Sequence, residues 1–189
     1  MIKNKSTLIE LKKDLEIVHE GEEILSKKRD LLLKEIMQIV DIVDKRRKEL
    51  NETIKSSYNI LIKALMENKN LSPVPFVKTE LKVVQKSFLG IVIPKIDFKI
   101  TSRPQIVLDT NIFEDLARES FFKSLKMILE LAELEIKIWK LSVELKQTLI
   151  RVNALKYHYI PKYEKEIKEI KTYLEESERE FIAIIKKLK

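Results

Sequence analysis

Apolar residues recur along the first third of the chain at alternating spacings of three and four residues. From Leu8 to Leu50, ten of the thirteen positions with this spacing are apolar. The set is Leu8, Leu11, Leu15, Val18, Glu22, Leu25, Arg29, Leu32, Ile36, Ile39, Val43, Arg46 and Leu50. Because this spacing keeps one stripe facing a partner helix, the pattern predicts a coiled-coil helix. Beyond Leu50 the stripe continues, slipped by about one position, as Ile54, Tyr58, Leu61 and Leu65.

The start of this helix has three candidate caps. Asn4 and Ser6 are both of the residue types that accept hydrogen bonds from the first backbone amides of a helix. Thr7 is followed three residues later by Glu10, which is the spacing of a capping box. The sequence therefore predicts a helix that begins between residues 4 and 7.

The last third carries a second stripe of the same kind, in which fifteen of twenty positions are apolar. Its positions are Phe122, Leu125, Leu129, Ala132, Ile136, Trp139, Val143, Lys146, Ile150, Asn153, Tyr157, Ile160, Glu164, Ile167, Lys171, Leu174, Glu178, Phe181, Ile185 and Leu188. Trp139 is expected as an apolar anchor, and Asn153 as a buried amide that fixes the register. Before Tyr157, flanking apolar residues widen the stripe and predict contact with more than one neighbouring helix. They include Ile128, Leu131, Leu134, Ile138, Leu141 and Leu149.

The middle of the chain, residues 71–113, holds four of the five prolines. Ser72-Pro73-Val74-Pro75 ends the first helix, because proline donates no hydrogen bond and disfavours helix before it. Strand-like runs at 80–84, 89–93 and 96–100 predict a short β-hairpin that turns near residues 85–90. Asp109-Thr110-Asn111 is typical of the start of the next helix.

These patterns predict a mainly α fold in which the two terminal helices form one long antiparallel coiled coil. The expected organisation is an N-terminal coiled-coil helix at 1–70, a middle segment with the hairpin at 71–113, and a C-terminal coiled-coil helix at 114–189. If the chain ends meet, facing residue numbers sum to roughly 190. Pro161 is expected to break the helical hydrogen-bond ladder. Arg29 then either donates to the carbonyls freed near Pro161 or extends into solvent.

Composition narrows the classes of function. The formal charge is +7, but acids and bases are mixed along both helices, so no nucleic-acid interface is predicted. The absence of cysteine suits a reducing, cytoplasmic setting, and the apolar runs are too short to insert into a membrane. Neither His19 nor His158 has a second histidine or cysteine three or four residues away with which to chelate a metal. With no phosphate loop or nucleophile elbow, we expect no catalytic residue, no cofactor and no metal.

Several short segments resemble the family of D subunits from archaeal- and vacuolar-type rotary ATPases. On the first helix these are Gly21 and Lys27-Lys28-Arg29-Asp30-Leu31-Leu32. The more specific segments come later, and they are Leu89-Gly90-Ile91-Val92-Ile93-Pro94, Arg151-Val152-Asn153-Ala154-Leu155, Ile160-Pro161 and Leu174-Glu175-Glu176-Ser177-Glu178-Arg179-Glu180-Phe181. The resemblance spans nearly the whole chain. Lys156, where that family more often has Glu, and residues 101–118 depart from it.

The resemblance implies a non-catalytic central stalk, or rotor shaft, on the cytoplasmic side of a membrane. The implied partners are the catalytic and regulatory ring subunits, a small F-type stalk subunit and a funnel-shaped adaptor on the membrane rotor. Such a shaft transmits torque between ATP hydrolysis or synthesis and the transport of H⁺ or Na⁺. The implied family-signature residues are Lys28, Arg29, Asp30, Arg151, Val152, Asn153, Ala154, Leu155, Ile160 and Pro161. A basic end is expected at the bearing of the ring, formed by Lys3, Lys5, Lys186, Lys187 and Lys189.

Two other classes remain open from the sequence alone. A prefoldin-like chaperone also has a coiled-coil hairpin with β structure in the middle, but it exposes apolar groups at the tips of its coil. A nucleic-acid-binding coil would show salt-dependent binding to mixed DNA or RNA. The residues do not distinguish H⁺ from Na⁺ as the coupling ion, nor synthesis from hydrolysis of ATP.

Overall fold

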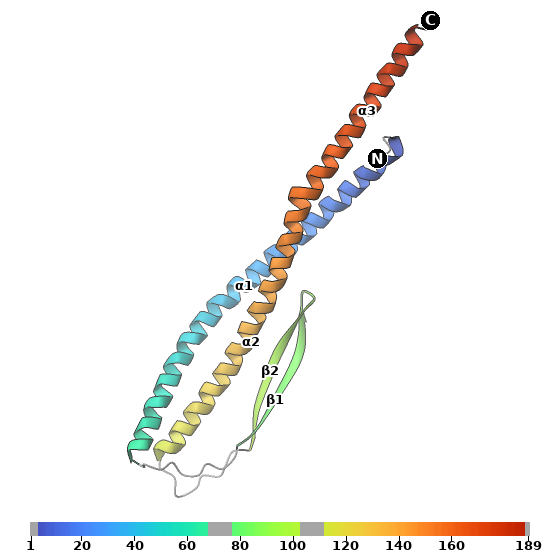
Figure 1. Ribbon diagram of the computed structural model, residues 1–189. Coiled ribbons are helices and arrows are strands. Elements are labelled where there is room, and N and C mark those ends of the chain that lie inside the picture. Colours follow the sequence, from blue (N-terminus) through green and yellow to red (C-terminus); the bar gives the residue numbers. More distant parts are fainter. Residues whose placement is uncertain (1–3, 68–76, 103–111, 188–189) are drawn as a thin grey trace. The chain divides into compact units, whose positions relative to one another are not determined.

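The computed structural model describes residues 4–67, 77–102 and 112–187. Its elements are α1 (Lys5–Glu67), β1 (Lys78–Phe88), β2 (Ile91–Ser102), α2 (Ile112–Ala154), a π-helical turn η1 (Leu155–Tyr159) and α3 (Ile160–Lys187). The predicted fold class, mainly α with a central hairpin, is confirmed (Figure 1). The proline segment 72–75 and the capping cluster 109–111 lie outside the described residues.

The chain divides into two units. One unit contains residues 1–33 and 145–189, so it pairs the start of α1 with the end of α2, with η1 and with α3. The other contains residues 34–144, which hold the rest of α1, the hairpin and most of α2. We call them the terminal unit and the hairpin unit.

The predicted stripe on α1 is confirmed as its buried face. Leu11, Leu32, Ile39, Val43 and Leu50 are buried, and of the thirteen predicted positions Arg46 alone is exposed. The start of α1 is capped by the first of the three candidates. The Thr7 amide donates to Asn4 Oδ1 at 2.7 Å, which satisfies an N–H that would otherwise lack a partner.

Beyond Leu50 the predicted slip of the stripe is wrong. Ser57 and Ala64 are fully buried and keep the seven-residue repeat that runs on from Leu50. Of the slipped stripe, Tyr58 and Leu65 are exposed, and Ile54 and Leu61 are half-buried. The reason is size: small residues at the contact let two helices approach closely, so the bulkier neighbours turn outward.

A cluster of hydroxyl groups marks this close approach within the hairpin unit. Ser57 Oγ lies within hydrogen-bond distance of Ser120 Oγ and, at 3.3 Å, of Ser124 Oγ. Ser57 also donates to the Thr53 carbonyl, and Ser124 donates to the Ser120 carbonyl. These bonds satisfy polar groups that would be costly to bury alone. Polar serines therefore occupy seam positions that an apolar pattern does not reveal.

The predicted seam on the second helix is wrong between Ile136 and Tyr157. Its members are exposed there, and they are Ile136, Trp139, Val143, Lys146, Ile150, Asn153 and Tyr157. The buried or half-buried face consists of Leu131, Leu134, Ile138 and Leu141 in the hairpin unit, and Leu145, Thr148, Val152 and Leu155 in the terminal unit. Two apolar stripes therefore run along this helix. The buried stripe consists mainly of compact aliphatic residues, because aromatic rings at the contact would need a larger distance between the helix axes. Trp139 is accordingly 66% exposed, while Leu141 is fully buried.

The π-helical turn η1 keeps the inward stripe of the terminal unit in line. After Leu155 the half-buried or buried apolar and aromatic positions are Ile160, Tyr163, Ile167, Ile170 and Leu174. The step from Leu155 to Ile160 is five residues, which would rotate the stripe off its face in a regular helix. In η1 the Ile160 amide donates to the Leu155 carbonyl, five residues back, and absorbs the extra residue. The predicted break in the ladder at Pro161 is confirmed in this form, directly before the proline.

The antiparallel pairing is confirmed, but the predicted register is wrong. In the terminal unit Lys5 Nζ lies 2.9 Å from Glu178 Oε1, whereas a sum of 190 would place Lys5 opposite Ile185. In the hairpin unit Ser57 faces Ser120, well short of Glu133. α2, η1 and α3 follow one another without a gap and together are longer than α1. In the terminal unit α3 therefore continues past the start of α1, and residues 175–187 are all exposed.

The hairpin forms as predicted, with longer strands than the three short runs suggested. β1 and β2 pair antiparallel, with Leu81 opposite Phe98 and Val83 opposite Ile96. The turn falls at Leu89 (φ 50°) and Gly90 (φ 80°). Positive φ at both positions matches the twist of the strands, and it is glycine that adopts this conformation without strain.

The hairpin lies along α2 in the hairpin unit (Figure 1). The Ile96 amide donates to Glu133 Oε2 at 2.9 Å, and Lys140 Nζ donates to the Val92 carbonyl at 2.6 Å. Lys137 Nζ lies 5.3 Å from the centre of the Phe88 ring. On its α1 side, α2 forms ion pairs from Arg46 to Glu130, from Arg47 to Glu135 and from Lys137 to Glu35. The widened face predicted a second neighbouring helix, and that prediction is wrong for the described residues, because the second neighbour of α2 is the hairpin.

Candidate interaction surfaces

The C-terminal signature residues surround the π-helical turn, and they point in two directions. The inward group is buried or half-buried, and it consists of Val152, Ala154, Leu155 and Ile160. The outward group is exposed, and it consists of Arg151, Asn153 and Pro161. The expectation that Asn153 is a buried register-fixing amide is therefore wrong, since the inward position beside it belongs to Val152. The outward group presents polar atoms at a place where the helix backbone is irregular.

The N-terminal signature places Arg29 next to its own sequence neighbour. Arg29 Nε donates to Asp30 Oδ1 at 2.8 Å, and this hydrogen bond raises the pKa of the guanidinium. Among the described residues Arg29 forms no hydrogen bond with the carbonyls near Pro161, so that hypothesis is wrong. The hypothesis assumed backbone carbonyls left free before Pro161. In η1 the backbone hydrogen bonds are rearranged instead, and the Ile160 amide donates to the Leu155 carbonyl. Lys28 is half-buried, and Asp30 is exposed.

The predicted basic end is partly described. Lys5 is paired with Glu178, while Lys186 and Lys187 are exposed in the last turn of α3. Lys3 and Lys189 lie outside the described residues. Cations in a last turn also interact favourably with the C-terminal end of the helix dipole. Apolar side chains are exposed on the same turns, at Phe181, Ile182, Ile184 and Ile185.

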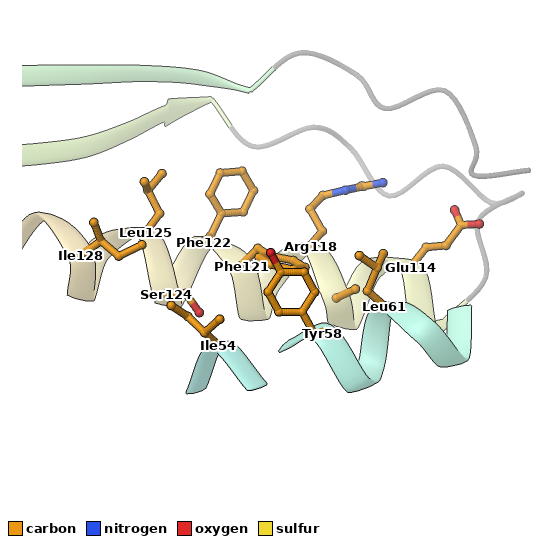
Figure 2. A pocket seen from close by; sticks show the side chains of 11 residues that line it. Ile54, Tyr58, Leu61, Glu114, Arg118, Phe121, Phe122, Ser124, Leu125 and Ile128 are labelled. Atoms are coloured by element: carbon orange, nitrogen blue, oxygen red, sulfur yellow. The ribbon is translucent and has the colours of Figure 1, made fainter. Parts of the chain in front are cut away.

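An apolar cavity of about 540 Å³ lies between α1 and α2 in the hairpin unit (Figure 2). Its lining is Ile54, Tyr58, Leu61, Glu114, Ala117, Arg118, Phe121, Phe122, Ser124, Leu125 and Ile128. The rings of Tyr58 and Phe121 meet edge to face at 5.5 Å. Charged groups occur at one end, where Arg118 lies 3.2 Å from Asp115. Such a groove suits apolar side chains of another protein better than a reaction that needs paired acids and bases. The sequence pattern does not single it out, because it predicts Ile54, Tyr58 and Leu61 as residues of the seam.

Across 4–67, 77–102 and 112–187, no three His, Cys, Asp or Glu side chains gather closely enough to hold a metal ion. His158 stacks edge to face on Tyr159 at 5.2 Å. Within these ranges no helix is long and apolar enough to cross a bilayer.

Two long antiparallel helices with a hairpin along α2 define the class of the molecule, which is a coiled-coil protein. The comparison with family models makes this specific: the model for the D subunit of ATP synthase matches residues 7–189. The chain belongs to this family of ATP synthase D subunits.

Individual relatives agree along the full length. The D subunit of the V-type ATP synthase of Thermotoga neapolitana is 32% identical, over 98% of this chain and 95% of its own. The D subunit of the A-type ATP synthase of Thermococcus gammatolerans is 32% identical over 96% and 90%, respectively. The A-type counterpart from Methanosphaera stadtmanae is 31% identical over 98% and 91%. The resemblance in the signature segments thus extends across the chain, and the prefoldin-like alternative is set aside.

Proposed function

We propose that this chain is the central stalk, or rotor shaft, of a V/A-type rotary ATPase. The observation that carries the proposal is the antiparallel pairing of the start of α1 with α3 in a chain of the D-subunit family. At 1.5 Å per residue, the 63 residues of α1 extend about 95 Å. Two long helices locked along a common seam resist twisting, which a part that carries torque requires.

In this role the chain does no chemistry itself. ATP hydrolysis or synthesis occurs in the catalytic and regulatory ring subunits, and rotation couples it to H⁺ or Na⁺ transport in the membrane. The chain is peripheral, on the cytoplasmic side. Its further partners are the small F-type stalk subunit and the funnel-shaped adaptor on the membrane rotor. The apolar cavity near Tyr58 and Phe121 is suited to receive apolar side chains from one of these two.

The proposal gives the signature residues two kinds of task. Val152, Leu155 and Ile160 hold the seam on both sides of η1, so the signature preserves the shape of the shaft. The lysines at the terminal end, Lys3, Lys5, Lys186, Lys187 and Lys189, are assigned to the bearing end of the ring. The exposed apolar side chains on the same turns of α3 stabilise the contact with the ring by burying apolar surface.

Recovery from the native host tests the proposal. A tagged form of this chain should co-purify with the nucleotide-binding ring subunits and the small stalk subunit in constant ratio. The ratio should survive gel filtration, since a large interface with apolar side chains releases its partners slowly. Recovery of the chain alone, or in a chaperone hexamer without nucleotide-binding subunits, would overturn the assignment.

A further inference from the structure

One stretch of the terminal unit lacks the mixed charge of the rest of the helices. The nineteen residues from Leu145 to Tyr163 contain four cations and no carboxylate. The next nineteen residues, 164–182, contain seven carboxylates. The cations are Lys146, Arg151, Lys156 and Lys162. Together with the exposed residues Ile150 and Tyr157 we call them the basic belt.

The cations of the belt are directed to solvent and are not neutralised locally. All four are exposed, and within the described residues none of them forms an ion pair. Lys156 Nζ lies 5.8 Å from the centre of the Tyr157 ring, a contact that leaves its charge in place. An exposed surface of one sign attracts a partner of the opposite sign.

Two carboxylates of α1 in the same unit, Glu23 and Asp30, are paired with cations of α1 itself. Glu23 accepts a bond from Lys27 Nζ at 2.6 Å, and this hydrogen bond lowers the pKa of the carboxyl. Asp30 is paired with Arg29. Because both carboxylates are already paired within α1, they do not neutralise the cations of the belt.

The belt also has an apolar centre. Lys146, Ile150, Asn153 and Tyr157 follow one another at spacings of four, three and four residues, so they share a face of the helix. Ile150 is 60% exposed and Tyr157 is 71% exposed. A partner that fits has an apolar patch with carboxylates around it. One exposed tyrosine beside an isoleucine provides little of the stacking surface that single-stranded nucleic acid uses.

We infer that the basic belt is a docking surface for an acidic, partly apolar protein surface on the ring subunits that enclose the shaft. The inference rests on the proposed function and adds to it the site and the chemistry of one contact. Exposed ion pairs are individually weak and are screened by salt, so such a contact can form and release as the shaft turns. The irregular backbone of η1 lies inside the belt.

Charge reversal in the assembled complex tests the inference. Lys146→Glu with Lys156→Glu should weaken binding of the chain to rings prepared from its own host roughly tenfold at low salt. The difference should shrink in about 0.5 M salt, because screening removes the attraction. The matched control is Lys45→Glu with Lys48→Glu, an equal charge change on exposed lysines of α1 outside the belt, and it should bind like the unaltered chain. The neutral pair Lys146→Gln with Lys156→Gln should fall between them.

The outcomes separate the inference from the proposed function. Equal ring binding by the belt variants and the control at low salt would overturn the inference while leaving the shaft assignment intact. Failure of the unaltered chain to bind the ring would overturn the shaft assignment and the inference with it. Binding of mixed-sequence DNA that the belt variants lose, with ring binding unchanged, would assign the belt to nucleic acid and also overturn the inference.

Discussion

Replacing Leu32 by Ala will lower the free energy of unfolding by about 2–5 kcal/mol. Leu32 is fully buried on the seam of the terminal unit, so truncation removes apolar contacts and leaves a cavity that the helices fill only partly. The loss should appear as a lower midpoint in urea unfolding followed by circular dichroism, with an unchanged dependence on urea concentration.

The neighbouring residue supplies the control for this prediction. Leu31 has the same side chain, but it is 54% exposed. Leu31→Ala should therefore change the free energy of unfolding by no more than about 0.5 kcal/mol, as is usual for surface positions. Similar losses for the two variants would show that the face of α1 described by the structure is not the buried one.

Deleting His158 together with Pro161→Ala will leave the free energy of unfolding within about 1 kcal/mol of that of the unaltered chain, because both residues are exposed and the buried stripe is kept. The deletion shortens the step from Leu155 to Ile160 from five residues to four, so the alternation of three and four continues without a π-helical turn. The alanine restores an amide donor and removes the ring that would clash in a regular helix. Thermal and urea unfolding both measure the result.

The matched control deletes Lys165 in the same Pro161→Ala background. Lys165 is exposed, as His158 is, but its loss rotates every later residue by about 100°. Ile167, Ile170 and Leu174 then leave the seam, and at about 1.5–3 kcal/mol each the loss should be at least about 4 kcal/mol. Equal destabilisation by the two deletions would contradict the explanation of η1 as an inserted residue.

The sequence was sufficient for the fold class, because a spacing of 3.5 sustained through α1 admits few other structures. The α1 seam as far as Leu50 and the Asn4 cap follow from local chemistry that the rest of the chain does not override. The hairpin was also recognisable, since Gly90 supplies a positive φ between two strand-like runs.

The second helix could not be assigned from its own pattern. It carries two apolar stripes, and only the partner helix decides which of them is buried. The pattern predicts Trp139 as a buried residue, whereas the structure buries Leu141. Ser57 and Thr148 are fully buried on the true seam, and polar residues at seam positions hide the repeat. The register also depends on how the longer helix is offset against the shorter one, and neither helix encodes this offset alone.

The candidate surfaces differ in how much of each the sequence reveals. The signature residues were found by resemblance, but their inward and outward division required the structure. The basic belt had a signal that overall charge conceals, which is the absence of any carboxylate across residues 145–163. The apolar cavity required three-dimensional contacts, because its walls come from segments more than fifty residues apart.

Rotation of the chain within its ring is the measurement that tests the shaft assignment most directly. The sequence has no cysteine, so Ser87→Cys on the exposed edge of the hairpin gives a single thiol to which a bead can be attached. With the ring immobilised and ATP supplied, the bead should turn continuously in one direction, and it should stop when ATP is withdrawn. A ring that hydrolyses ATP while the bead attached to this chain shows only random motion would contradict the account.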